Sequence, residues 1–443
     1  MDAVTAKKEW RGGAHLLGLV AVSLLAGGVV GLVAASFRLA LEWAELRRVV
    51  VLEWARASPV GAVLVIAGCA LAAALAAWLV QRFSPDSAGS GIPHVETVLQ
   101  HDAPISTWRL VPVKFVGGLL AIGSGQALGR EGPSVQMGAT LAHEVGRWFG
   151  WTRMDCRSLL AAGAGAGLST AFNAPIGGSV FVLEELVRRF DTRITIVTFG
   201  ASSAAIGVTR LMLGSRAEFP LGEIIEPALA ALPGFLLLGL LLGFAGVAYN
   251  RLIMGMLAMS DRAERIPRAA RAAGVGAIVG VIGLLIPSAV GGGDLLTTGA
   301  LHWDGTKAWW ILAGLLLLRF VLGPLSYAAQ TPGGLFAPLL AVGAQAGVLY
   351  GLGWNLLADA AWPRMHVEPP VMGVIAMVGL FAAVVRAPLT GIVLVAEMTV
   401  GTKLLLPMIG VCIGAMLVPT AMGNEPIYES LKLRAMRVSA KRG

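Results

Sequence analysis

The chain has 443 residues, of which 56% are hydrophobic and only 14% are charged, and it carries a formal net charge of +8. Soluble proteins carry about 25% charged residues, so the composition indicates a membrane protein instead. The positive charge does not indicate a nucleic-acid-binding protein. The basic residues lie mainly at the two ends and in short loops, where membrane orientation requires them.

Apolar runs without Asp, Glu, Lys or Arg recur along the chain. They comprise residues 12–37, 57–81, 227–250, 272–293 and 404–424. A helix needs about 20 apolar residues to cross a bilayer, so these runs predict a polytopic membrane protein. The first run is too long for the apolar part of a signal peptide and has no convincing cleavage site, so we expect it to remain in the protein.

Basic residues flank the apolar part at both ends. Lys7, Lys8 and Arg11 precede the first run, and Lys432, Arg434, Arg437, Lys441 and Arg442 follow the last one. Such residues mark the cytoplasmic side, so we expect a multi-pass protein of the cell (inner) membrane with both termini in the cytoplasm. The predicted order is a cytoplasmic N-terminal segment (1–11), two membrane halves (12–215 and 228–430) and a basic cytoplasmic tail (431–443).

The cysteines and histidines predict no disulfide framework and no metal site. The three cysteines are odd in number and scattered, and the six histidines show no ligand spacing. His143-Glu144 begins like a zinc-binding helix, but the second histidine of that motif is missing. We therefore expect no metal and no cofactor.

The two halves of the chain resemble each other. Ala174, Pro175, Gly178, Val180, Val182 and Glu184 recur at an offset of 213 as Ala387, Pro388, Gly391, Val393, Val395 and Glu397. Gly129, Pro133 and Gly138 recur at an offset of 205, and Gly31 and Phe37 match Gly243 and Tyr249 at 212. The constant order predicts a duplication, although Gly, Ala and Pro are so common that some matches can be accidental. Inverted halves with an odd number of crossings each place both termini on one side, in agreement with the charges.

Four short segments carry polar groups into this apolar chain. They are Gly89–Pro93, Gly129–Gln136, Gly333–Pro338 and Asn424–Tyr428. Three of them have the form of a Gly-rich loop ahead of a helix. A helix start offers unpaired N–H groups and the positive end of the helix dipole, so several starts aimed at one point form an anion site without a buried cation. Ser90 and Tyr428 add hydroxyl donors.

Glu131 is the acid at the centre of the second segment. Ionisable residues inside a membrane are rare and usually functional. The alternative is that Glu131 and Arg130 pair with each other in a loop near the surface.

In their order and combination, these segments resemble the signature motifs of the CLC family of chloride channels and chloride/proton antiporters. With residues 172–185 and 389–399 the resemblance covers nearly the whole chain, and it is to the prokaryotic type, without C-terminal CBS domains. It implies an all-α, inverted-topology repeat of many tilted and discontinuous helices, and a homodimer with one pathway per subunit.

The resemblance also implies roles for single residues. Chloride is the bound substrate, held by the hydroxyls of Ser90 and Tyr428 and by the backbone amides of Leu335 and Phe336. Glu131 is the external gate and carries protons. Its carboxylate is itself an anion and competes with chloride for the same amides, so chloride binding and protonation of the gate favour each other.

Glu185 distinguishes an antiporter from a channel. The resemblance matches it to the internal proton glutamate of the antiporters, so we predict a secondary transporter that exchanges chloride for protons. The alternative is a passive, voltage- or pH-gated chloride channel of the same fold. Glu185 could instead close a helix at the surface and pair with Arg188 or Arg189, a weak and common arrangement.

Several of the remaining residues also have a purely structural interpretation. Ser90 could be a helix N-cap, Tyr428 an interfacial anchor and Phe336 a packing residue. Lys114, Arg319, Arg386 and Glu397 are expected to have structural partners. An intramembrane enzyme is not expected, because no known catalytic arrangement is present. A fluoride-exporting relative would depart at the segments that look standard here.

Overall fold

The computed structural model describes residues 3–101, 104–215, 217–222, 226–305 and 308–440. Over these ranges the fold is built of 17 α-helices and no strands. The first repeat half contains α1 (Ala3–Arg56), α2 (Pro59–Phe83), α3 (Ile92–His101), α4 (Leu110–Gly123), α5 (Glu131–Trp148), α6 (Arg153–Phe172), α7 (Pro175–Phe181) and α8 (Thr192–Leu213). The second contains α9 (Leu232–Arg262), α10 (Arg268–Leu285), α11 (Asp294–Leu301), α12 (Trp309–Ala328), α13 (Phe336–Ala361), α14 (Pro369–Val385), α15 (Pro388–Thr399), α16 (Leu405–Ala421) and α17 (Ile427–Ala440).

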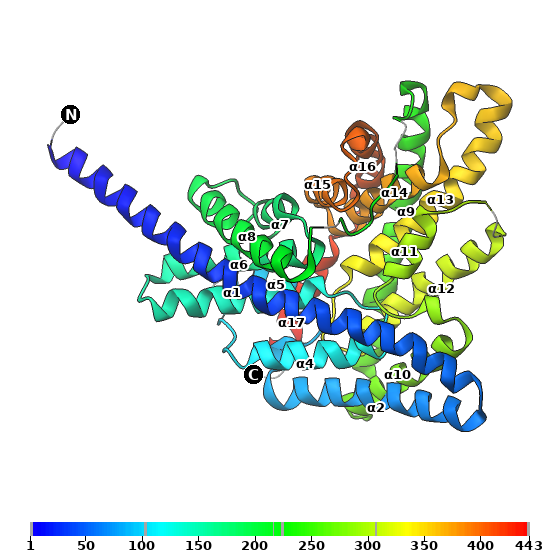
Figure 1. The fold of residues 1–443 in the computed structure, drawn as a ribbon, viewed down its shortest axis with the longest axis horizontal. Coiled ribbons are helices and arrows are strands. Elements are labelled where there is room, and N and C mark those ends of the chain that lie inside the picture. Colours follow the sequence, from blue (N-terminus) through cyan, green and yellow to red (C-terminus); the bar gives the residue numbers. More distant parts are fainter. Residues whose placement is uncertain (1–2, 102–103, 216, 223–225, 306–307, 441–443) are drawn as a thin grey trace.

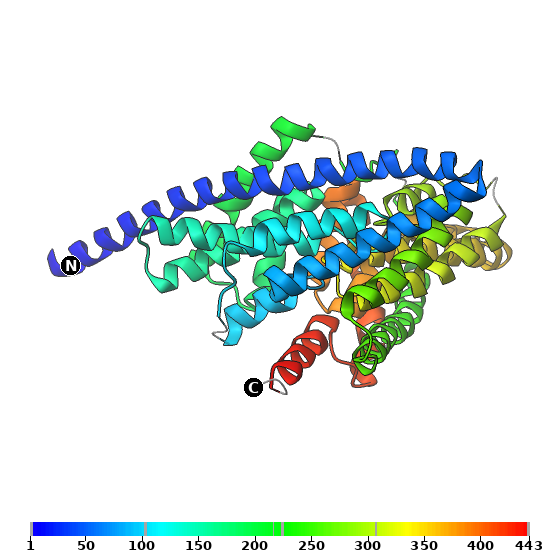
Figure 2. The ribbon, with the colours of Figure 1, turned by 90° about the horizontal axis from the view of Figure 1, so that it is seen from below.

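Eight of the helices are long and apolar enough to cross a membrane: α1, α2, α8, α9, α10, α12, α13 and α16. Each of the five charge-free runs lies largely on one of these helices, which confirms the prediction of a polytopic helical protein. The long helix α1 runs along one side of the molecule beside α2 and α4 (Figures 1 and 2). Met1, Asp2, Lys441 and Arg442 of the predicted end segments lie outside the described residues.

In three of the four polar segments a glycine-containing loop leads into a helix, as predicted. The helices α3, α5 and α13 begin at Ile92, Glu131 and Phe336, directly after glycine-containing loops. Gly91 has a φ of +83°, and a Cβ atom there would lie 2.1 Å from the side-chain oxygen of Gln136. Only glycine fits this turn, so the loop ahead of α3 can pass tightly over α5.

Residues related by the repeat contact each other in the middle of the molecule. Gly129 and Gly334, which are related by the offset of 205, exchange two backbone hydrogen bonds of 2.9 and 2.7 Å. The short helices α7 and α15 lie side by side (Figure 1). Equivalent positions in the two halves therefore face one another, as an inverted repeat requires.

This reciprocity is explicit in two glutamates, Glu184 on the turn that follows α7 and Glu397 on α15. The Glu397 carboxylate on α15 accepts from the N–H groups of Ile176 and Gly177 at the start of α7, at 3.2 and 2.7 Å. At the offset of 213, Glu184 accepts from the N–H groups of Leu389 and Thr390 at the start of α15, at 3.0 and 2.6 Å. Each acid is bound to the positive end of the partner helix.

Two buried cations form a second related pair. Lys114 on α4 donates to the carbonyl oxygens of Ser87 and Gly89, at 3.0 and 2.7 Å, and so supports the loop ahead of α3. At the offset of 205, Arg319 on α12 donates to three carbonyl oxygens of the loop ahead of α11: Ala289, Gly291 and Gly292. The expected structural partners of these cations are thus backbone carbonyls.

Candidate functional site

Glu131 is completely buried at the first position of α5. Its Oε1 accepts from the N–H groups of Phe336 and Ala337 at the start of α13, at 2.6 and 3.2 Å, whereas Oε2 has no hydrogen-bond partner. The carboxylate therefore occupies the positive end of a helix from the other repeat half. A surface pair with Arg130 is excluded, because Arg130 forms ion pairs with Glu218 and Asp294 instead.

The hydroxyls of Ser90 and Tyr428 are the polar groups expected beside this carboxylate. Both side chains are fully buried, and neither hydroxyl has a hydrogen-bond partner within the protein. The Ser90 hydroxyl packs on α5, since a Cβ atom at Gly132 would lie 2.5 Å from it. The burial of Tyr428 excludes an interfacial anchor, and the free Ser90 hydroxyl is not used as an N-cap.

Leu335 and Phe336 lie at the start of α13, both fully buried. The Phe336 ring packs against Phe172 and Phe381, with ring centroids 5.0 and 4.2 Å away. Phe336 is thus a packing residue and an amide donor at once. Its ring fixes the helix start whose N–H groups meet the Glu131 carboxylate.

This arrangement suits the binding of a monovalent anion. The Glu131 Oε1 atom stands where an anion would accept the same N–H groups. A buried hydroxyl without a partner costs about 1–3 kcal/mol, and an anion between such donors recovers that energy. These N–H and O–H donors are dipoles and not full charges, so they bind an anion weakly enough for release.

Arg130, the residue before Glu131, is bound to other groups than the Glu131 carboxylate. Its Nε donates to the Ala171 carbonyl at 3.0 Å, its Nη2 pairs with Glu218, and its Nη1 lies 3.6 Å from Asp294. Glu218 belongs to the connection between α8 and α9 and also pairs with Arg38 at 2.7 Å. Burial alone would raise the pKa of Glu218, but the two guanidinium groups hold it below its ordinary value.

Glu185 lies on a π-helical turn, Val182–Leu186, that follows α7 directly. Only 4% of the residue is exposed, and its Oε1 has no hydrogen-bond partner; the nearest cation, Arg188, is 3.8 Å away. A salt bridge at the surface therefore does not explain it. Single π-turns occur often at functional sites.

The surroundings of Glu185 form a compact cluster of acids and cations. Glu96 on α3 is fully buried and lies 2.9 Å from Arg188 and 3.2 Å from Lys432. Lys432 also lies 2.7 Å from Glu429. Three acids thus share two cations, and Glu185 has the longest contact of the three. Because a buried charge needs a partner, Glu185 is the member of the cluster best suited to hold a proton.

Lys432 differs from its expected position. The sequence places it in a basic cytoplasmic tail, but only 2% of it is exposed, and α17 continues without interruption across this boundary. Its neighbour Arg434 binds Asp261 on α9 through a bidentate ion pair. At least these two basic residues serve tertiary packing, which a composition-based prediction does not detect.

Next to the Ser90 loop, a cavity of about 600 Å³ opens between α3 and α17. Gly89, Gly91 and Tyr327 line its inner end, and His101 and Arg434 lie farther out. The Tyr327 hydroxyl accepts from the Ser90 N–H at 3.4 Å. The cavity brings solvent close to Ser90 on the side remote from Arg130.

The comparison with known proteins decides the family. A family model described as "Voltage gated chloride channel" matches residues 72–420 of the chain. The chain belongs to this CLC family. The match confirms both the resemblance seen in the motifs and the CLC-like helical fold.

CLC relatives cover almost the entire chain. The H(+)/Cl(-) exchange transporters ClcA of Vibrio parahaemolyticus and Citrobacter koseri are 38% and 35% identical, and the alignments cover 94% and 95% of this chain and 89% of each relative. Among solved structures, a slow cyanobacterial Cl-/H+ antiporter is 33% identical with a TM-score of 0.89, covering 95% of this chain and 98% of that one. A eukaryotic CLC transporter shares the fold, with 24% identity and a TM-score of 0.80, covering 95% of this chain and 74% of that one.

Tyr428→Phe tests the anion site of this CLC protein. We expect the chloride affinity to fall about tenfold, because a hydrogen bond to a charged group contributes about 1.5 kcal/mol or more. The thermal stability without chloride should not fall, since the hydroxyl has no partner in the protein. Isothermal titration with chloride measures the affinity. Tyr249→Phe is the matched control, with a hydroxyl that is equally buried and unpartnered. An equal loss in both variants would contradict the assignment.

Proposed function

We propose that the protein exchanges chloride for protons across the membrane, with Glu131 as the external gate and Glu185 as the internal proton acceptor. The observation that carries this proposal is the Glu131 carboxylate bound to two N–H groups of α13. The relatives named as H(+)/Cl(-) exchange transporters support it. Chloride binds between the Ser90 and Tyr428 hydroxyls and the amides of Leu335 and Phe336.

The coupling follows from competition for one set of donors. While it is ionised, the Glu131 carboxylate occupies the start of α13 and excludes an anion. A protonated carboxyl gains less from the helix end, so it leaves and chloride takes its place. One carboxyl group therefore links the movement of the two ions, and neither a metal nor a cofactor is needed.

The cluster around Glu185 favours the antiporter over a passive channel. A channel needs no second protonatable group remote from the gate, and burying one is costly. Here a buried carboxyl with one long ionic contact, Glu185, shares Arg188 with Glu96. Glu185 exchanges protons with the cytoplasm, and Glu131 exchanges them with the outside.

Chloride is the favoured anion. The loop ahead of α3 has Ser90 with a free hydroxyl, and serine at this position accompanies chloride selectivity in the family that the motifs resemble. The CLC-type fluoride/proton antiporter shares the fold at 22% identity and a TM-score of 0.75, covering 91% of this chain. At that identity the similarity supports the fold alone.

The orientation follows from the charges. We place the protein in the cell (inner) membrane, with both termini in the cytoplasm and the repeat halves at residues 12–215 and 228–430. The α17 end of the molecule, with the 600 Å³ cavity, then faces the cytoplasm. The Arg130 network faces outward.

We also propose a homodimer with one pathway in each subunit. The short helices α7 and α15 have 7 and 12 residues, too few to cross a bilayer alone. Nevertheless Ile176 and Leu389 at their starts are 49% and 45% exposed. A second copy packed on this face would shield these helix ends from lipid.

The dimer is tested by the mass of the purified protein. We expect light scattering in mild detergent to give twice the 45.9 kDa of one chain. A monomer mass at every protein concentration would contradict the dimer and leave the proposed exchange untouched.

Glu131→Gln tests the gate. The neutral amide neither competes as an anion nor carries a proton, so we expect chloride flux to continue without proton movement. Purified protein in liposomes, with external chloride and pH recorded together, measures both. Continued chloride-driven proton uptake by this variant would refute the proposed role.

Glu185→Gln tests the internal acid. We expect proton flux to fall at least about tenfold, which corresponds to about 1.4 kcal/mol on the barrier, while chloride flux continues. The same liposome assay applies, and Glu144→Gln is the control, because Glu144 pairs with Arg147 on α5 outside the cluster. Proton flux equal to that of the unmodified protein would favour a purely structural Glu185.

A further inference from the structure

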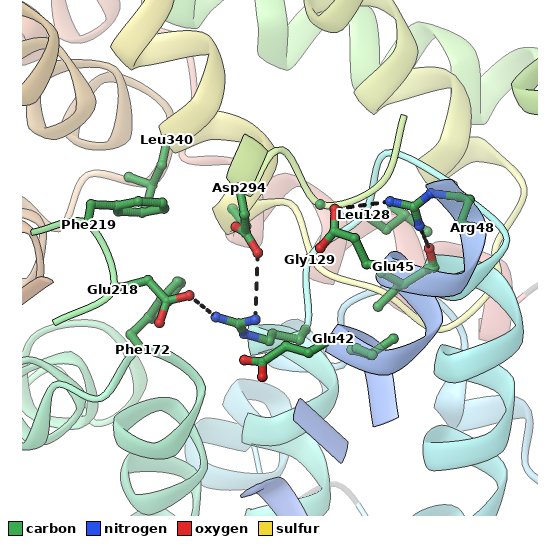
Figure 3. Close-up of a pocket in the computed structure, with 15 residues that line it drawn as sticks. Glu42, Glu45, Arg48, Leu128, Gly129, Phe172, Glu218, Phe219, Asp294 and Leu340 are labelled. Atoms are coloured by element: carbon green, nitrogen blue, oxygen red, sulfur yellow. Dashed lines mark hydrogen bonds and ion pairs between the residues drawn. The ribbon is translucent and has the colours of Figure 1, made fainter. Parts of the chain in front are cut away.

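A small cavity with several carboxylates lies beside Glu131, and the proposed orientation places it toward the outside. It has a volume of about 30 Å³ and lies between α1, the start of α5, the α8–α9 connection and the start of α11 (Figure 3). Its lining includes Gly129, Arg130, Glu218, Asp294 and Ala337. A water molecule needs about 10–15 Å³ of such volume, so the cavity has room for about two.

The cavity adjoins the free oxygen of the gate. A Cβ atom at Gly129 would lie 2.0 Å from Glu131 Oε2, and Gly129 lines the cavity. Ala337, which donates its N–H to Glu131 Oε1, lines it as well. Oε1 is engaged by α13, whereas the unpartnered Oε2 is separated from the cavity only by a glycine.

Among the carboxyl groups of the cavity, Asp294 is the one held most loosely. Glu218 is 8% exposed and bound by two guanidinium groups. Glu42 and Glu45 lie 2.8 and 3.1 Å from Arg38 and Arg48. Asp294 is 34% exposed, and its one ionic contact within the described residues is Arg130 at 3.6 Å. It can therefore accept a proton without breaking a short ion pair.

The backbone fixes Asp294 in this position. Asp294 begins α11 directly after Gly291, Gly292 and Gly293, and Arg319 holds this loop through its carbonyl groups. Lys114 holds the loop that carries Ser90 in the same manner. The repeat thus contains two glycine loops that are each fixed by a buried cation. In the proposed orientation, the loop with Ser90 lies toward the inside and the loop with Asp294 lies toward the outside.

Charged groups of several elements surround Asp294. They are Arg130 at the start of α5, Glu218 in the α8–α9 connection, Arg319 on α12, and Arg38, Glu42, Glu45 and Arg48 on α1. Figure 3 shows Asp294 and Glu218 turned toward the same guanidinium, that of Arg130. Burial raises the pKa of Asp294, so the group can accept a proton, and the Arg130 guanidinium counteracts this effect and favours return to the carboxylate.

We propose that Asp294 is a proton relay between the outside and Glu131, an inference that rests on the proposed exchange of chloride for protons. Asp294 takes a proton from hydronium in the outer solution and becomes neutral. It then donates a proton through one or two waters in the cavity to Oε2 of Glu131. Asp294 returns to the carboxylate, Glu131 becomes neutral, and one proton has moved inward without any other bond changing.

Asp294→Asn tests the relay. We expect the coupled proton rate to fall about tenfold or more, because a positioned acid accelerates proton transfer by about a hundredfold or more. The remaining rate should also lose its dependence on outer pH while keeping its dependence on inner pH. The assay uses full-length protein oriented in membranes, with the pH varied on each face separately. Asp294→Glu should restore most of the rate and of the outer pH dependence.

Controls separate the relay from a structural role. Glu42→Gln changes a carboxyl of the same cavity that is 41% exposed and bound to Arg38, and it should behave like the unmodified protein. Chloride titration of Asp294→Asn checks that the anion site is folded. An unchanged proton rate in Asp294→Asn would overturn the relay. A proton rate in Asp294→Glu as low as that in Asp294→Asn would overturn it as well. Absence of coupled exchange in the unmodified protein would instead overturn the proposed function, and the relay with it.

Discussion

The structure depends on one interaction: the buried carboxylate of Glu131 bound to the first N–H groups of α13. A charge without a partner in this interior would cost several kcal/mol. The N–H groups at the start of α13 stabilise the negative charge without a cation. The same N–H groups can therefore bind either the carboxylate or a separate anion. Side-chain packing stabilises the position of this helix start, because Phe172 and Phe381 contact the Phe336 ring.

The duplication explains how such a site can form from short helices. A helix start in the middle of a membrane is tolerated only where other backbone or side chains cover it. In the inverted repeat, each half of the chain provides these partners for the other half. Gly129 bonds to Gly334, and Glu397 accepts from the start of α7. Glutamates, glycines and cations at related positions therefore stabilise helix ends that a single half would leave unsatisfied.

Much of the fold and the central site could be predicted from the sequence, because both depend on local signals. Apolar runs define the spanning helices, and glycine loops ahead of Ile92, Glu131 and Phe336 define the helix starts. The charged networks could not be predicted in the same way. The sequence predicts Lys432 to be a solvated tail residue, but its Nζ donates a hydrogen bond to Glu96, which lies 336 positions earlier in the chain. Glu218 lies in a linker and gains its role only when the fold brings it to Arg130.

The network around Arg130 and the cluster around Glu185 share one electrostatic design. In each, short ion pairs hold acids in place: Glu218 with Arg130 and Arg38 in one network, Glu96 with Lys432 in the other. One acid in each network has only a long ionic contact, Asp294 at 3.6 Å and Glu185 at 3.8 Å. In the proposed exchange, protons move through these two loosely held acids, while the tightly paired acids preserve the structure. Coupling then requires only that Glu131 exchange protons with each side in turn while it exchanges places with chloride.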